Sequence, residues 1–165
     1  MTKDEVLELF AYNAWANRTL FDGVAGVPAE DYLRDLKSSH GGIHGTLCHT
    51  AWAEQLWLTR WLGMPPPAVP QGRDLASLAA VRGRWEEIEA QRAGFLAGFA
   101  AARLDDTVRI KPTTGGEFVH SYRQMFRHCV NHSSYHRGQV VTMMRQVGVR
   151  PPSTDLILFY RKQIP

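Results

Sequence analysis

Apolar residues recur at steps of three and four along most of the chain, the spacing that places side chains on one face of a helix. Four long stretches share this pattern and predict helices over residues 2–23, 39–62, 74–102 and 122–147. Thr2 followed by Glu5 is a capping-box pattern at the first start, and Asp74 is the expected N-cap of the third helix. Gly63 and Gly148, each followed within three residues by proline, predict the ends of the second and fourth helices.

Two shorter elements complete the prediction. Residues 107–111 and 117–120 flank a Pro-Thr-Thr-Gly-Gly sequence and predict a short β-hairpin before the last long helix. Residues 153–161 predict a short C-terminal helix, with Ser153 or Thr154 as its cap.

The connections favour a single domain. Residues 28–39 are polar, with room for one helical turn, and residues 65–73 form an irregular loop rich in proline and glycine. A chain of 165 residues is the size of one domain with a sizeable core. Long helices joined by two crossings and a hairpin predict an all-α four-helix bundle over residues 1–165.

The apolar face of the last long helix contains two histidines. Its positions, at alternating steps of three and four, are Met125, Cys129, His132, His136, Val140, Met143 and Val147. His132 and His136 are four residues apart, so their imidazoles leave one face about one turn apart. Burying two imidazoles side by side is costly unless a partner takes their lone pairs. A divalent metal ion is such a partner.

His49 is the expected third ligand. It shares a line on helix 39–62 with Ala53, Leu56 and Arg60, so it points the same way as core residues. Counted along the predicted helices, His49 and the pair on 122–147 all lie mid-helix. Three neutral imidazoles leave coordination positions open, as in catalytic sites. Histidine nitrogens suit zinc, nickel, iron(II) or copper, and the sequence does not choose among them.

Other residues near this pattern receive different interpretations. We expect His128 to line a pocket or support the ligands, and we expect His40 and His120 to be surface or cap residues. Cys129 is interpreted as a small buried hydrophobe, and both cysteines as reduced thiols. Asn13 interrupts the first helix's apolar face and predicts a hydrogen bond to a neighbouring helix, or a role behind the ligands. The charges of helix 74–102, Arg92 among them, predict a solvated surface.

Charge and hydropathy narrow the class of protein. The 19 basic and 16 acidic residues are interspersed and give a net charge of +3, too small to predict a nucleic-acid partner. No apolar run is long enough to span a membrane, and the first residues do not form a signal peptide. The expected location is therefore the cytoplasm, with neither membrane nor nucleic acid as a partner.

Three strings resemble the DinB family of the DinB/YfiT-like superfamily. The most specific is Asn131-His-Ser-Ser-Tyr-His-Arg-Gly-Gln139; the others are Gly45-Thr-Leu-Cys-His49, followed by Trp57-Leu58, and Tyr12-Asn-Ala-Trp-Ala-Asn17. The resemblance covers nearly the whole chain. It implies an up-down-down-up course of the four helices, a homodimer, and a three-histidine metal site that maps onto His49, His132 and His136.

The resemblance also implies a class of chemistry. The superfamily includes bacillithiol and mycothiol S-transferases, a mycothiol-dependent maleylpyruvate isomerase and metal-dependent hydrolases. We therefore predict a divalent-metal-dependent enzyme that activates a low-molecular-weight thiol, or water, for attack on a small-molecule substrate. An S-transferase is favoured over a hydrolase by analogy alone. No general base stands out, and His128 and Tyr135 are the candidates. The alternative is a non-catalytic stress or DNA-damage-inducible protein in which the ion is structural.

Overall fold

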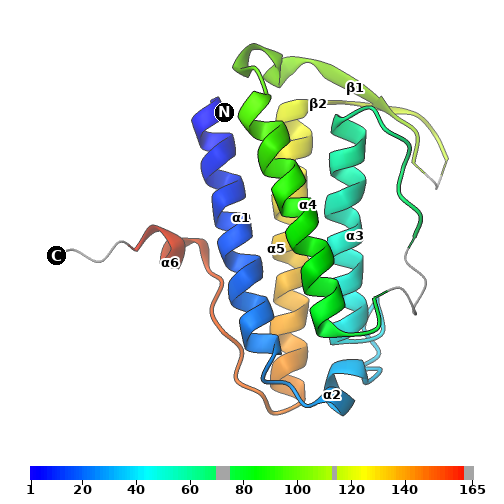
Figure 1. Cartoon of the computed structure of the whole chain (residues 1–165), viewed down its shortest axis with the longest axis vertical. Helices are drawn as coiled ribbons and strands as arrows, with labels where there is room; N and C mark the ends of the chain where they lie inside the picture. Colours follow the sequence, from blue (N-terminus) through cyan, green and yellow to red (C-terminus); the bar gives the residue numbers. More distant parts are fainter. Residues whose placement is uncertain (70–74, 113–114, 162–165) are drawn as a thin grey trace.

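Four long helices form an up-down-down-up bundle in the computed structural model, which describes residues 1–69, 75–112 and 115–161 (Figure 1). They are α1 (Lys3–Val24), α3 (Ile43–Trp61), α4 (Leu78–Gly98) and α5 (Tyr122–Gln146). α1 and α5 run in one direction, and α3 and α4 run in the other (Figure 1). The predicted bundle, hairpin and short last helix are confirmed.

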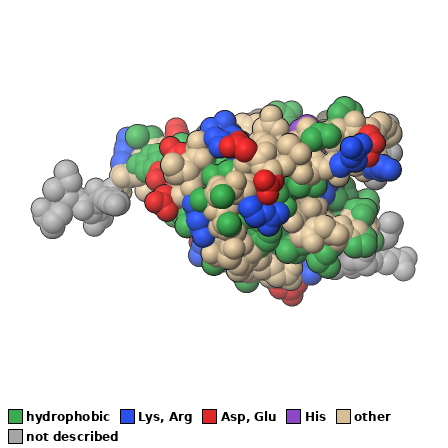
Figure 2. Space-filling view, turned by 90° about the horizontal axis from the view of Figure 1, so that it is seen from above, with side chains coloured by type: hydrophobic (Ala, Val, Ile, Leu, Met, Phe, Trp, Pro, Cys, Tyr) green, Lys and Arg blue, Asp and Glu red, His purple; other side chains and the backbone are tan. Residues whose placement is uncertain are grey.

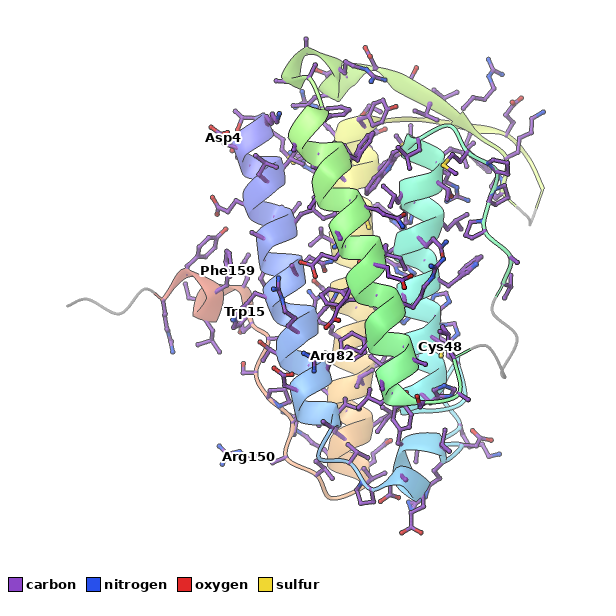
Figure 3. The ribbon with its side chains drawn as sticks, viewed as in Figure 1. Asp4, Trp15, Cys48, Arg82, Arg150 and Phe159 are labelled. Carbon is purple, nitrogen blue, oxygen red and sulfur yellow. The ribbon has the colours of Figure 1, made fainter. Side chains whose placement is uncertain are left out.

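The smaller elements lie at the two ends and on one side of the bundle. α2 (Ala29–Leu33) lies at one end; the 3₁₀ helix η1 (Ala101–Asp105) and the antiparallel pair β1 (Thr107–Ile110) and β2 (Phe118–Ser121) lie at the other (Figure 1). α6 (Leu156–Tyr160) packs on α1, where the rings of Phe159 and Trp15 are 5.8 Å apart (Figure 3). Seen from above, the hairpin end carries basic, acidic and hydrophobic side chains interspersed (Figure 2).

Capping residues fix most of the helix starts. The capping box of Thr2 and Glu5 is present, and α5 begins with a second one, in which Ser121 pairs with Gln124. The cap of α4 is the Ser77 hydroxyl, which accepts from the Ala80 amide; the expected cap, Asp74, lies outside the described residues. The predicted caps of the last helix are wrong, because the Asp155 carboxylate accepts from the Ile157 amide instead.

α3 begins four residues later than its apolar pattern predicts, at Ile43. The preceding residues form a tight turn in which the Ser38 and Gly41 backbones pair. Gly41 has a φ of +82°, a left-handed conformation that glycine adopts without steric cost. The helix therefore starts after the turn, and His40, which lies within the turn, can place its side chain against α3.

Aromatic side chains fill the core at the hairpin end. The ring of Phe126 meets three others edge to face, with centroids 5.9 Å from Phe10, 4.9 Å from Trp61 and 5.3 Å from Phe99. This is the preferred geometry for aromatic pairs because the ring edges are positive and the faces negative. All four long helices contribute to this cluster or adjoin it, so that end of the bundle is closed by apolar packing.

Candidate metal centre

Four imidazoles converge between α3, α5 and the turn that precedes α3. Nε2 of His132 is 3.4 Å from Nε2 of His49 and 3.1 Å from Nε2 of His136. A ring nitrogen of His40 joins those of His49 and His136 in a group whose atoms all lie within 4.8 Å of one another. His49 is the seventh residue of α3, so it is closer to the helix start than the predicted mid-helix position.

The two Nε2 separations that meet at His132 suit a divalent ion. A tetrahedral ion with bonds of about 2.05 Å to nitrogen holds its ligand atoms about 3.3 Å apart. Both distances to His132 are close to that separation. An imidazole Nε2 offers either one N–H or one lone pair, so His132 Nε2 can form one well-directed hydrogen bond, to His49 or to His136, and the other close contact is left without one. A cation removes that conflict.

Gln139 sets the tautomer of His136. Its Oε1 is 2.7 Å from Nδ1 of His136, and because an amide oxygen only accepts, Nδ1 carries the proton and donates it. Nε2 of His136 is therefore left with a free lone pair on the side of the cluster. The Gln139 amide also donates to the Ser39 hydroxyl at 3.5 Å, which links α5 to the turn that carries His40. The sequence interpretation gave Gln139 no role, although its position three residues after His136 places the two side chains next to each other on a helix.

The cluster is neutral at pH 7. Burial, together with the smaller effect of the neighbouring imidazoles, lowers the pKa of His49 and of His132 to about 4. Burial also lowers the pKa of His40 and of His136. All four rings therefore keep a lone pair under physiological conditions, which is the state that binds a metal ion.

The expectation that His40 is a surface or cap residue is wrong. Its ring stacks on His49, with centroids 3.8 Å apart and planes 14° from parallel, and it meets His136 edge to face at 5.2 Å. Gly45 makes this placement possible, because a Cβ at that position would lie 1.9 Å from the His40 carbonyl oxygen. The position of His40 follows from this close approach of the turn to α3, which helical periodicity does not reveal.

The other residues named from the sequence lie around the cluster. His128 is exposed and lines a pocket, as expected; its ring is 5.7 Å from that of His132. His120 lines the same pocket. Tyr135 is 64% exposed, and its ring meets that of His136 edge to face with centroids 5.1 Å apart. Cys129 is buried and free, and burial raises the pKa of its thiol, so it acts as an apolar side chain.

A buried carboxylate behind the histidines went unnoticed in the sequence. Glu54 is 1% exposed, and its Oε1 accepts from the side chains of Asn13 at 2.8 Å, Asn17 at 3.0 Å and Ser133 at 2.6 Å. Its Oε2 accepts from Trp85 and forms an ion pair with Arg92. Five donors from α1, α4 and α5 thus meet one carboxylate of α3.

This network corrects one expectation and bears out another. Arg92, predicted to lie on a solvated surface, is 2% exposed and supplies the counter-ion of Glu54. Asn13 does bond to a neighbouring helix, and its Oδ1 also accepts from Arg137 at 2.7 Å. Ser133 adjoins His132 in sequence, so the network supports the backbone from which a histidine of the cluster extends.

Replacing Gln139 with leucine is expected to weaken binding of a divalent ion by about 10- to 100-fold, the usual effect of removing a group that orients a ligand. The leucine removes the acceptor that keeps the proton on Nδ1 of His136. Competition titration with a colorimetric chelator measures the change in affinity. Gln146→Leu, at an exposed position of the same helix, is the matched control. Equal affinities in the two variants would contradict the role given to Gln139.

A four-helix bundle with imidazoles from α3 and α5 close together is the arrangement that the resemblance to the DinB family implied. Comparison with known proteins supports that resemblance. The model of the DinB family matches residues 1–165, and the chain belongs to that family. It is 27% identical over 169 residues to Protein DinB of Bacillus subtilis (strain 168), a match that covers 96% of each chain. Among the helices of the described ranges, none is long and apolar enough to cross a membrane.

Proposed function

We propose that this protein is a divalent-metal-dependent enzyme acting on a small molecule, as a thiol-dependent S-transferase or a hydrolase. His49, His132 and His136 would hold the ion. The observation that carries the proposal is that Nε2 of His132 lies 3.4 Å from Nε2 of His49 and 3.1 Å from Nε2 of His136, although it can form a directed hydrogen bond with only one of them. When bound, the ion would lower the pKa of a thiol or of water that reaches it.

The chain's own residues prepare this site. Gln139 holds the His136 ring in the tautomer with a free Nε2. His40 covers one face of His49 through its stacked ring, so it restricts the side from which a small molecule approaches. The exposed phenol of Tyr135 and the imidazole of His128 lie near His136 and His132 respectively, and both groups are able to move a proton.

A catalytic role is favoured over a purely structural one because the bundle already has an internal cross-link. Glu54 joins α3 to the other three long helices through hydrogen bonds and an ion pair. Because Glu54 on α3 already bonds to Ser133 on α5, an ion is not needed to connect these two helices. His49 and His132 are half-buried rather than sealed in the core, which leaves the cluster accessible from outside.

Metal analysis and thiol titration test the proposal. Elemental analysis of purified protein should give about one divalent ion per chain and name the metal. Candidate low-molecular-weight thiols are then titrated into the cobalt-loaded protein, and the visible spectrum should gain a thiol-dependent band. A spectrum that no thiol changes, with transferase activity absent, would leave hydrolysis. Absence of any bound metal, or a coordination sphere that neither thiol nor water enters, would overturn the enzyme proposal.

A further inference from the structure

A hollow lies beside the histidine cluster, where residues of the hairpin, α3 and α5 meet. It has a volume of about 460 Å³. Its apolar walls include Trp57, Ile110, Phe118 and Met125, and its polar lining consists of Arg60, His120, Gln124 and His128. A mostly apolar cavity with a few converging polar groups is the usual form of a small-molecule site.

The cation in this pocket is held in place. The Arg60 guanidinium lies over the Trp57 ring, 4.6 Å from its centroid, in a cation–π contact. Trp57 is itself fixed by the edge-to-face contact with His128 at 4.8 Å. Burial lowers the pKa of Arg60, which means that its charge is incompletely solvated. Within the described ranges, no ion pair includes Arg60.

The remaining polar groups of the lining favour an anion. No Asp or Glu is among the lining residues. The Gln124 Oε1 accepts from the Ser121 amide at 3.0 Å, so the capping box occupies its acceptor atom and leaves its NH₂ group as a donor. Imidazole rings can supply a further N–H. An anion would therefore find donors and a guanidinium, with no carboxylate in the lining to repel it.

One wall of the pocket lies one turn of α5 from the histidine cluster. His128 belongs to the pocket, and its ring is 5.7 Å from that of His132. From His132 back to Gln124 is eight residues, about 12 Å along the helix axis at 1.5 Å per residue. A molecule of that length could have one end beside Arg60 and the other end beside the imidazoles.

We propose that this pocket binds the carboxylate end of an elongated, partly apolar small molecule. Arg60 pairs with the carboxylate, Gln124 donates to it, and the apolar walls contact the carbon skeleton. Binding of the carboxylate is independent of the function proposed above. Only the assignment of the other end of the molecule as the end that reacts at the metal centre rests on that function. The pocket would thereby select carboxylated substrates or thiols.

The binding test uses the full-length protein without metal, so that it does not depend on the metal centre. 4-Phenylbutyrate is titrated while the Trp57 indole N–H resonance is followed by NMR, after assignment with Trp57→Phe. We expect saturable shifts, with at least about tenfold weaker binding for 4-phenylbutyramide and for the Arg60→Gln variant, as for loss of one charge-assisted hydrogen bond. Arg109→Gln, an exposed hairpin arginine paired with Glu117, is the matched control and should bind like wild type.

Equal binding of the amide and the carboxylate, or wild-type affinity in Arg60→Gln, would overturn the proposal. A second titration uses the cobalt-loaded protein and ω-mercapto carboxylates of increasing length. Affinity should peak near a thiol-to-carboxylate separation of about 12 Å, the span of two helical turns and a fraction. Carboxylate binding without such a peak would support the carboxylate site and contradict its connection to the metal centre. Absence of carboxylate binding in a protein that binds metal and thiol would contradict the carboxylate site and leave the proposed function standing.

Discussion

Glu54→Gln should lower the free energy of unfolding by about 3–5 kcal/mol, the cost of leaving a buried charge without its partner. The substitution preserves the shape of the side chain, so it creates no cavity. It removes the negative charge that faces Arg92 and places an NH₂ group where an oxygen accepts hydrogen bonds. Urea denaturation of the metal-free protein at pH 7, followed by tryptophan fluorescence, measures the change.

Glu86→Gln is the matched control. Glu86 pairs with Arg82 at 3.0 Å in an exposed i, i+4 ion pair, which should contribute less than about 1 kcal/mol. If both glutamine variants lose the same small amount, the Glu54 network is not a major source of stability.

The effect of Glu54→Gln should also depend on pH. Burial alone would raise the pKa of Glu54, but Arg92 and the hydrogen bonds to its oxygens outweigh burial and lower that pKa below the ordinary 4.5. As the pH falls below 4.5 the unfolded chain takes up the proton first, so the stabilisation is full above 4.5 and is lost as the pH approaches the lowered native value. The gap between wild type and Glu54→Gln should therefore narrow from pH 6 to pH 3, while a constant gap would contradict an ionised Glu54.

His49→Ala should abolish stoichiometric metal binding. Removing a group that only supports a ligand usually lowers metal affinity by about 10- to 100-fold, so removing a ligand itself should lower it by more than about 100-fold. The alanine removes the only proposed ligand on α3 and leaves the local pair His132 and His136. Elemental analysis after gel filtration and chelator competition measure the loss. The metal-free variant should unfold at nearly the wild-type urea concentration, because His49 is not part of the Glu54 network.

His44→Ala controls for the loss of an imidazole from the same helix. Nε2 of His44 is 2.6 Å from the Leu75 carbonyl oxygen, to which it donates, so this ring faces away from the cluster. Full metal content in His44→Ala alongside loss in His49→Ala would support the assignment. Full metal content in both variants would exclude His49 as a ligand.

The i, i+4 spacing of His132 and His136 on an apolar face, and the alignment of His49 with core residues, were sufficient to predict three converging imidazoles. Such periodicity reports which face of a helix is buried. It does not report where a turn folds back onto a helix, and His40 reaches the cluster through such a turn, made possible by the absence of a side chain at Gly45.

Glu54 and Arg92 show a second limit. Charged residues are almost always exposed unless they are paired. Here the two members of the pair lie on different helices and are 38 residues apart in the chain. A single sequence therefore gives no local signal that separates this pair from the exposed pairs of α4. Asn13 was more informative, because one polar residue within an apolar face predicts a buried hydrogen bond.

The distance in sequence between the imidazoles has a consequence for folding. His49 and His132 are 83 residues apart, and bringing them together in an unfolded chain costs loop-closure entropy before any ion can be held by both. The unfolded chain offers an ion only histidines that are close in sequence, such as His132 and His136 on the segment that becomes α5. Free metal would therefore stabilise the native bundle by mass action, and occupation of the site should follow folding rather than guide it.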